Sequence, residues 1–284
     1  MAEDDFGDQD DFTPDEIGDW TERKIWIVTE YARRYAEIMT NQIFKFYYID
    51  GFSGGGIHIR KVTGERVLST ARKILDIQPE FDAYVFIDLD EGKVAAMQRA
   101  CAENKKARVI LGDANTVLPR DVFPKVAYAL YRRALCFLDP YKMLLSWEVI
   151  LAAAKQQTIE LFIHFPTQDV NRNALRRDRA SVRPDDHRRM TQMWGDASWE
   201  AHIFEESLGL FEPVRSKAPV TKIVEEFRRR LKEQAGFLHV SKAVPMYNRS
   251  NGIVYHLIFA SMNETGLRIA NGVFKAASKP PKDV

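Results

Sequence analysis

The sequence predicts an α/β protein with a doubly wound, mostly parallel sheet, and three observations lead to this fold class. Apolar, β-rich runs alternate with segments of helical periodicity, the links between them are short, and the runs are apolar almost throughout. Strands whose two faces are both covered by helices have this near-continuous apolar character. The alternation of strand and helix at such spacing is typical of a parallel sheet.

The first half of the chain supplies these elements in order. A helix is predicted over 20–39, begun by a capping box of Asp19 and Glu22, with an apolar face that includes Tyr31 and Tyr35. Five strands are expected over 44–50, 83–88, 108–111, 134–139 and 158–165. Helices are expected between them near 66–77, 91–104 and 146–156.

The pattern changes after residue 165. Residues 166–236 contain no convincing strand and are expected to form a basic helical insertion. Strands over 237–247 and 252–261 then form an antiparallel hairpin, because Asn251-Gly252 lies at the bend, and a last helix covers 264–277. Five parallel strands followed by such a hairpin predict a class I methyltransferase-like Rossmann fold with a seven-stranded sheet. Its core spans 19–165 and is completed by 237–284.

Composition narrows the class of protein further. The chain has 284 residues, of which 45% are hydrophobic, enough for a full core without covalent staples. Cys101 and Cys136 form no metal or redox spacing, which excludes a disulfide scaffold and a zinc finger. No apolar run approaches the roughly 20 residues of a membrane span, and the acidic start is unlike a signal peptide. We expect a cytoplasmic protein.

Charge is distributed unevenly along the chain. The net charge is only +1, but residues 1–18 carry eight acids and no base. The remaining residues hold 41 bases against 32 acids. We expect an acidic, disordered leader over 1–18. The alternative is a mobile anionic segment that competes for the basic surface of the body.

Aspartates follow four of the five expected parallel strands. Ligands of doubly wound sheets bind outside the carboxyl ends of the strands. One aspartate at such a position is often only a helix cap, but four at one edge of the sheet predict a binding crevice. These four residues are Asp50, Asp88, Asp113 and Asp139.

The loop after the first strand reads DGFSGGG over residues 50–56. It does not match G-x-G-x-x-G, the fingerprint of dinucleotide binding, but matches D-x-F-x-G-x-G, the first motif of many adenosylmethionine-dependent enzymes. We expect S-adenosyl-L-methionine as the cofactor. Asp88 would accept hydrogen bonds from the ribose hydroxyls and Asp113 from the adenine amino group, whereas Asp90 starts a helix and Asn115 caps one. The predicted cofactor-binding residues are Asp50, Gly51, Phe52, Gly54, Gly56, Asp88 and Asp113.

The fourth strand ends in Asp139-Pro140-Tyr141, the candidate catalytic residues. This tripeptide resembles the D/N-P-P-Y motif of methyltransferases that act on exocyclic amines. There Asp139 would accept the amine hydrogens and restore the nucleophilicity of the nitrogen, Pro140 would fix the loop, and Tyr141 would stack on the planar substrate. The alternative is a structural Asp-Pro turn with a packed tyrosine.

A basic segment is the candidate for substrate contact. Residues 171–190 hold seven arginines against three aspartates, and the helix near 221–235 adds more. Arginine is suited to phosphates and can stack on bases; the alternative is a solvated helical face with internal ion pairs. The predicted nucleic-acid-binding residues are Arg172, Arg176, Arg177, Arg179, Arg228 and Arg229. His58 and His164 have no ligand partners in spacing, so we assign no metal and interpret His164 as packing at the edge of the core.

Taken together, these motifs resemble the three-Cys-motif partner (TcmP) family. The resemblance runs from WTERKIWIVTEY through YYIDGFSGGG, FIDLD, GDAN and FLDPY to YHLIFASMNETG. It implies a methyltransferase-like Rossmann fold and a three-Cys-motif protein as a possible partner. The expected function is an adenosylmethionine-dependent methyltransferase, or a protein of that fold, acting on RNA or DNA. The alternatives are a non-catalytic partner protein and, disfavoured by the missing glycine fingerprint, a nicotinamide-dependent enzyme.

Overall fold

The centre of the molecule is one eight-stranded sheet. The computed structural model describes residues 12–176, 178–208 and 213–278. The strands lie in the order β11-β13-β8-β7-β2-β5-β6, and β12 also pairs with β13. They are β2 (Lys45–Asp50), β5 (Ala83–Asp88), β6 (Ala107–Leu111), β7 (Arg132–Leu138), β8 (Ile159–Phe165), β11 (His239–Val240), β12 (Val244–Tyr247) and β13 (Ile253–Ser261). All pairs from β8 to β6 are parallel, whereas β13 is antiparallel to each of its neighbours.

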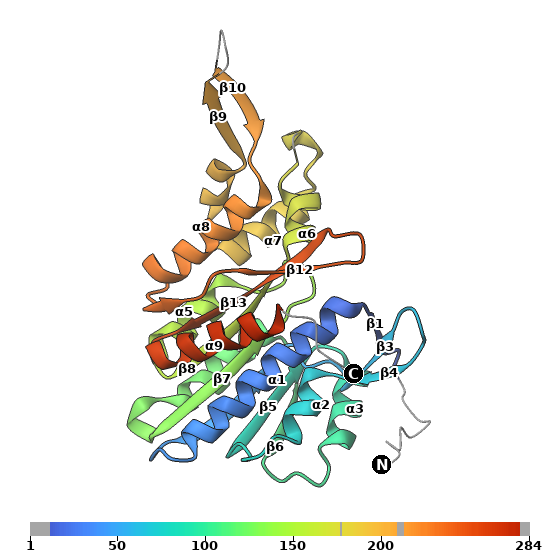
Figure 1. Cartoon of the computed structure of the whole chain (residues 1–284), viewed down its shortest axis with the longest axis vertical. Coiled ribbons are helices and arrows are strands. Elements are labelled where there is room, and N and C mark those ends of the chain that lie inside the picture. Colours follow the sequence, from blue (N-terminus) through green and yellow to red (C-terminus); the bar gives the residue numbers. More distant parts are fainter. Residues whose placement is uncertain (1–11, 177, 209–212, 279–284) are drawn as a thin grey trace.

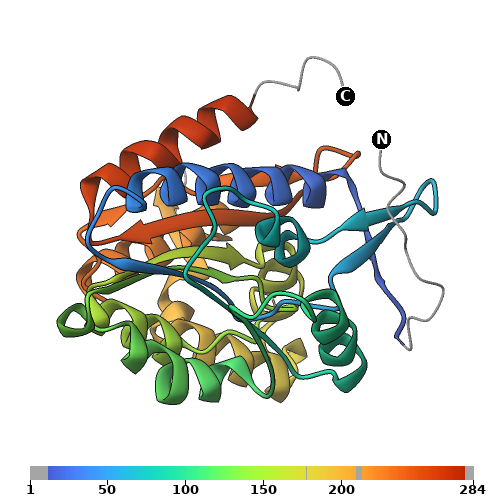
Figure 2. The ribbon, with the colours of Figure 1, turned by 90° about the horizontal axis from the view of Figure 1, so that it is seen from below.

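Helices cover both faces of this sheet, and Figure 2 shows the resulting layers edge-on. One face buries residues of α1 (Asp19–Met39), α2 (Thr70–Leu75), α3 (Glu91–Ala100) and α9 (Glu264–Ala277). The other buries residues of α4 (Ala114–Val117), α5 (Trp147–Gln156), α7 (Pro184–Trp194) and α8 (Val220–Glu233). α1 and α9 lie side by side across the first face (Figure 1). The predicted α/β class with a mostly parallel sheet is confirmed. No helix of the described ranges is long and apolar enough to cross a membrane.

The sheet ends in the predicted antiparallel hairpin, with one difference. The first hairpin strand is broken into β11 and β12, which pair with opposite halves of β13. The sheet therefore has eight strands where seven were expected. Asn251 occupies the left-handed region at the bend, with φ of 59°, as its position before Gly252 predicted.

The insertion is less helical than predicted. It begins with α6 (Thr167–Asp169), passes through π- and 3₁₀-helical turns at Val170–Ala174, Arg179–Ser181 and Ala197–His202, and contains α7 and α8. Between the helices, β9 (Phe204–Leu208) and β10 (Pro213–Lys217) form an antiparallel hairpin, which projects from the body in Figure 1. The expectation of no strand over 166–236 was wrong. The strand conformation of this segment depends on hydrogen bonds between β9 and β10, and the periodicity of the local sequence does not reveal such pairing.

A small sheet at the carboxyl edge was also not predicted. β1 (Asp15–Ile17) pairs in parallel with β3 (Ile57–Arg60), which pairs antiparallel with β4 (Arg66–Leu68). The helix expected over 66–77 is therefore reduced to α2. Residues 15–17 of the supposedly disordered leader form a strand, while residues 1–11 lie outside the described part.

The predicted capping box at the start of α1 is absent. Gly18 is the N-cap of this helix and makes no side-chain cap. Glu22 instead accepts hydrogen bonds from the Arg60 guanidinium of β3, with Nε 2.8 Å from Oε1. The contact joins α1 to the small sheet.

A buried arginine fastens the insertion to the core. Arg230 of α8 is 4% exposed, and its guanidinium lies between the rings of Trp147 and Trp194, 5.2 and 5.1 Å from their centroids. Nη2 donates to the carbonyl of Trp194 at 2.8 Å and to Asp196 at 2.9 Å, and Nη1 donates to Ser198. One side chain thus connects α5, α7 and α8.

We expect Arg230→Ala to lower the free energy of unfolding by about 2–4 kcal/mol, because it removes a stacked, hydrogen-bonded group from the core. Arg229→Ala is the matched control on the same helix, since that exposed side chain pairs only with Glu226 and Glu233. Its effect should stay below about 1 kcal/mol. Urea denaturation of both variants measures the difference; equal losses would contradict the anchoring role.

Candidate functional site

A cavity of about 690 Å³ lies at the carboxyl ends of β2, β5, β6 and β7. Its walls include the small sheet through β1 and His58, and the insertion through Gln192 of α7. All but one of the predicted cofactor and catalytic residues line it. These are Asp50, Gly51, Phe52, Gly54, Asp88, Asp113, Asp139, Pro140 and Tyr141. The topology thus brings together residues that are almost a hundred positions apart in the sequence.

The glycine loop is joined to both of the strands beside it. Oδ1 of Asp50 accepts from the backbone N–H of Phe52 at 3.1 Å, and the N–H of Gly54 donates to Oδ2 of Asp88 at 2.9 Å. Gly54 has φ of 65°, a conformation that favours glycine, and a side chain there would meet no neighbouring atom. Its role is therefore the backbone turn that presents this N–H to Asp88.

Gly56 is the predicted cofactor residue that the structure does not place in the cavity. Its φ is 89°, and a Cβ there would lie 2.9 Å from Cγ of Arg72 in α2. Gly56 is needed for this close approach of loop and helix. The last glycine of the motif thus has a packing function here.

The aspartates after β5 and β6 make different backbone contacts. Oδ1 of Asp88 accepts from the N–H of Asp90 at 3.0 Å, and Asp90 caps α3 through the N–H of Lys93, as expected. Asp113 caps α4 by accepting from the N–H of Asn115. The expectation that Asn115 itself is the cap was wrong, because the helix starts one residue earlier.

Asn115 connects the third strand end to the loop that follows Tyr141. Its Nδ2 donates to the carbonyl of Leu144 at 2.8 Å, and its Oδ1 accepts from the N–H of Ser146 at 2.7 Å. Tyr141 itself is 71% exposed, and the Lys142 ammonium lies 5.0 Å from its ring centroid. Tyr141 is therefore an accessible aromatic surface at the cavity mouth and not a packed core residue.

Asp139 is held by two partners that sequence reasoning did not assign to it. Oδ2 forms an ion pair with the ammonium of Lys24 in α1, and Oδ1 lies 2.5 Å from Nδ1 of His164 in β8. The Lys24 ammonium also lies 5.9 Å from the ring centroid of Phe137 and 5.6 Å from that of Tyr255. His164, expected to be packing at the edge of the core, instead contacts the candidate catalytic carboxylate.

The pKa values of the two central carboxyl groups, Asp50 and Asp139, are shifted in opposite directions. Burial raises the pKa of Asp50 to about 7, although the N–H of Phe52 acts against it. Burial also acts to raise the pKa of Asp139, but Lys24 and His164 outweigh it and hold that pKa well below its ordinary value. Near neutral pH the cavity therefore contains an ionised Asp139 with a fixed counter-charge and an Asp50 poised to change its protonation state.

Two histidines near the cavity are kept neutral. Burial lowers the pKa of His164, and the opposing effect of Asp139 is smaller. Burial and Lys24 lower the pKa of His58 to about 4. His58 lines the cavity, and its Nδ1 has no hydrogen-bond partner among the residues that the structure describes. A neutral imidazole of this kind can donate or accept a hydrogen bond at Nδ1, depending on its tautomer.

The predicted nucleic-acid residues do not form one surface with the cavity. Arg172 is exposed, and Arg176 donates to the carbonyls of Arg172 and Ser181. Arg228 pairs with Glu225, and Arg229 pairs with Glu226 and Glu233, so these charges are neutralised on their own helix. Arg177 lies outside the described residues, and Arg179 belongs to the 3₁₀ turn Arg179–Ser181. None of the described arginines lines the cavity.

Across the described residues, no group of three histidine, cysteine, aspartate or glutamate side chains is arranged to hold a metal ion. The thiols of Cys101 and Cys136 are both free and buried. Burial raises the pKa of each. Neither thiol is activated as a nucleophile.

Comparisons with known proteins give structural matches but no sequence match. The sequence matches no protein-family model and no curated protein. The structure is similar to protein LPL1258 from Legionella pneumophila, with a TM-score of 0.50, 12% identity, and coverage of 90% of this chain and 93% of that one. The TM-score is 0.41 for a Thermobifida fusca protein assigned as a methyltransferase (13% identity, 85% and 82% coverage). It is 0.33 for M. jannaschii TYW2 in complex with AdoMet (9% identity, 81% and 74% coverage).

The class that these observations define is a methyltransferase-like α/β protein. The strand order and the antiparallel β13 between β8 and the edge are those predicted for a class I methyltransferase fold. At identities this low, similarity to the solved structures concerns the fold alone. The chemistry has to be argued from the site itself.

We expect the Lys24–Asp139 pair to show strong energetic coupling. Lys24→Met and Asp139→Asn should each lower the free energy of unfolding by about 2–4 kcal/mol, because each leaves an ionic partner without its counter-charge. The double variant should lose less than the sum, by at least about 1.5 kcal/mol.

The exposed pair of Lys93 and Asp15 is the matched control for this cycle. Its coupling should not exceed about 1 kcal/mol. Denaturant titrations of both cycles give the two values. Additive losses for Lys24 and Asp139 would mean that the pair does not stabilise the carboxyl edge.

Proposed function

We propose that the protein is an S-adenosylmethionine-dependent methyltransferase that acts on nucleic acid. The observation that carries this proposal is the convergence of the glycine loop and four strand-end carboxylates on one cavity. A volume of about 690 Å³ lies within the roughly 300–1,000 Å³ of typical small-molecule sites.

The donors and acceptors of the cavity suit the cofactor. Asp88 would accept from the ribose hydroxyls, since each of its oxygens has one backbone contact and room for another. Asp113 would accept from the adenine amino group. Asp50, whose pKa burial raises to about 7 although Lys24 acts against it, would gain a further cation from the ammonium of the cofactor.

When bound, the cofactor would supply an electrophilic methyl group at the centre of the cavity. The chain would position the acceptor nitrogen: Asp139 would accept an amine hydrogen, and Tyr141 would stack on the planar base. The proton released would pass to solvent, because burial lowers the pKa of His58 to about 4 and this imidazole would not hold a proton near neutral pH. Positioning and electrostatics account for catalysis of this kind.

Nucleic acid is favoured as the substrate by one feature at the mouth and one outside the cavity. Tyr141 offers an exposed ring beside the ammonium of Lys142, a combination suited to an extruded base near a phosphate. Arg172 is exposed in the turn Val170–Ala174, which follows β8 and α6, and does not line the cavity. Arg228 and Arg229 contribute less, because glutamates already neutralise them.

One observation favours a second candidate function. Both oxygens of Asp139 are engaged, by Lys24 and by His164, which weakens the carboxylate as an acceptor for an amine. A non-catalytic protein that keeps this fold to dock a three-Cys-motif partner would also be consistent with such a site. The two candidates differ in whether methyl transfer occurs.

Calorimetric titration should show binding of S-adenosylmethionine, and Asp88→Asn should weaken it at least about tenfold, because one acceptor for the ribose diol becomes a donor. Asp90→Asn is the matched control, since Asn also caps helices and Asp90 does not line the cavity. NAD should give no heat. No heat from S-adenosylmethionine with the wild type would remove the cofactor from the proposal.

Transfer of a radiolabelled methyl group onto cellular RNA, DNA and protein tests the reaction. Asp139→Asn should reduce labelling of nucleic acid at least about a hundredfold while cofactor affinity is retained. Arg172→Ala should raise the KM for nucleic acid, with Arg229→Ala as the paired, neutralised control.

Equal labelling by wild type and Asp139→Asn would show that Asp139 serves only the structure. Preferential labelling of protein would exclude nucleic acid as the substrate. Cofactor binding without any labelling would favour the non-catalytic alternative.

A further inference from the structure

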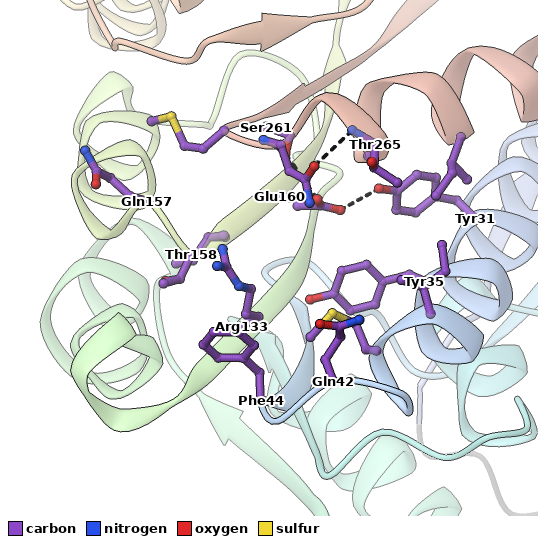
Figure 3. Close-up of a pocket in the computed structure, with 17 residues that line it drawn as sticks. Tyr31, Tyr35, Gln42, Phe44, Arg133, Gln157, Thr158, Glu160, Ser261 and Thr265 are labelled. Atoms are coloured by element: carbon purple, nitrogen blue, oxygen red, sulfur yellow. Dashed lines mark hydrogen bonds between the residues drawn. The ribbon is translucent and has the colours of Figure 1, made fainter.

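A second cavity, of about 260 Å³, lies at the opposite end of β7 and β8 (Figure 3). It is enclosed by the C-terminal half of α1, the start of α9 and the first residues of the two strands. It shares no lining residue with the cavity at the carboxyl ends. Its walls are partly aliphatic, through Ile38, Met39, Ile159 and Ile269.

A buried carboxylate faces this cavity. Glu160 of β8 is 9% exposed, and its oxygens accept from the Tyr31 hydroxyl at 2.5 Å and from Ser261 Oγ at 3.1 Å. Gly266 of α9 makes room for it, because a Cβ there would lie 2.5 Å from Oε1. Burial raises the pKa of Glu160 despite these two hydrogen bonds and the charge of Arg133. Among the described residues, no cation forms an ion pair with this carboxylate.

The guanidinium of Arg133 faces the same cavity but does not form an ion pair with Glu160. Arg133 lies over the rings of Phe44 and Tyr128, 4.7 and 5.7 Å from their centroids. Glu160 is paired in register with Leu135, two residues along β7 from Arg133, so the two charged groups are diagonal neighbours on one face of the sheet. Within the described part of the chain, the Arg133 guanidinium has no ion pair. The two charges therefore flank the cavity with a gap between them.

The hydroxyl of Tyr35 points into this gap. Tyr35 is 6% exposed, and its OH has no hydrogen-bond partner among the residues described. Figure 3 shows it directed between Arg133 and Glu160. A buried hydroxyl without a partner is costly and rare in native proteins. It therefore indicates a ligand that would supply the acceptor.

We propose that this cavity binds a small zwitterion, a free amino acid with an apolar side chain. The carboxylate of the ligand would accept from Arg133 and Tyr35, its ammonium would donate to Glu160, and its side chain would pack on the aliphatic wall. A simple anion would face Glu160 and a simple cation would face Arg133, so each would leave one buried charge uncompensated. A zwitterion satisfies both.

Calorimetry of the full chain with L-valine, L-leucine, L-isoleucine, L-methionine and L-phenylalanine is the direct test. At least one should bind. For the best of them, the N-acetyl derivative lacks the ammonium and the amide lacks the carboxylate. Each should bind at least about tenfold more weakly. Equal binding of either derivative, or no binding by any of the five, would overturn the proposal.

Tyr35→Phe is the informative variant, because it removes a hydroxyl that has no hydrogen-bond partner among the described residues. The Tm without ligand should stay the same or rise, while amino acid affinity should fall at least about tenfold. Arg133→Gln should cause a similar loss of affinity. A Tyr35→Phe protein that binds as well as the wild type would overturn the assignment of this hydroxyl and of the site.

Asp50→Asn is the control that separates the two cavities, because Asp50 lines only the first of them. An amino acid that occupied the cofactor cavity would place its ammonium at Asp50 and be sensitive to this change, whereas one bound at Glu160 should be unaffected. Loss of amino acid binding in Asp50→Asn with full binding in Tyr35→Phe would place the ligand in the first cavity and overturn the proposal.

Discussion

The carboxyl edge of the sheet depends on the ion pair between Lys24 and Asp139. β7 carries Asp139 to a position where burial alone would favour its protonated form, and the neutral His164 beside it cannot supply a full positive charge. The compensating cation comes from α1, which lies across one face of the sheet. Because the ammonium reaches the carboxylate past the rings of Phe137 and Tyr255, the pair also fixes how α1 packs. Fold and site are stabilised by the same contact.

Around this pair, some polar side chains at the strand ends stabilise helices and loops, and others remain available to a ligand. Asp90 and Asp113 cap helices, and Asn115 ties down the loop after Tyr141. Asp88 and Asp50 accept backbone N–H groups of the loops that they adjoin. Because backbone N–H groups orient these carboxylates, no second side chain is needed to hold them in place. Their remaining lone pairs are available to a ligand in the cavity. The backbone therefore orients both carboxylates in the structure without ligand.

Much of this arrangement follows from the sequence, and the exceptions have physical causes. Continuous apolar runs ending in Asp50, Asp88 and Asp139 were enough to predict the parallel sheet and the residues at its edge. Lys24 was missed although it lies four and seven residues before Val28 and Tyr31, a spacing that puts a lysine on the apolar face of its helix. The partner of His164 was not predictable, because the contact with Asp139 joins distant segments. The β9–β10 hairpin joins neighbouring segments and was missed because the residues that lead into β9 were interpreted as helical.

α1 contributes to both ends of the molecule, since Lys24 reaches the first cavity and Tyr31 and Tyr35 reach the second. An α-helix turns by about 100° per residue. Inserting or deleting one residue between Lys24 and Tyr31 would therefore rotate one of the two faces away from its partners by more than a quarter of a turn. Neither Asp139 nor Glu160 can move to follow, because each lies on or directly after a central strand of the sheet. The contacts of Lys24 with Asp139 and of Tyr31 with Glu160 therefore fix the number of residues between them, although the exposed residues of this stretch are free to vary.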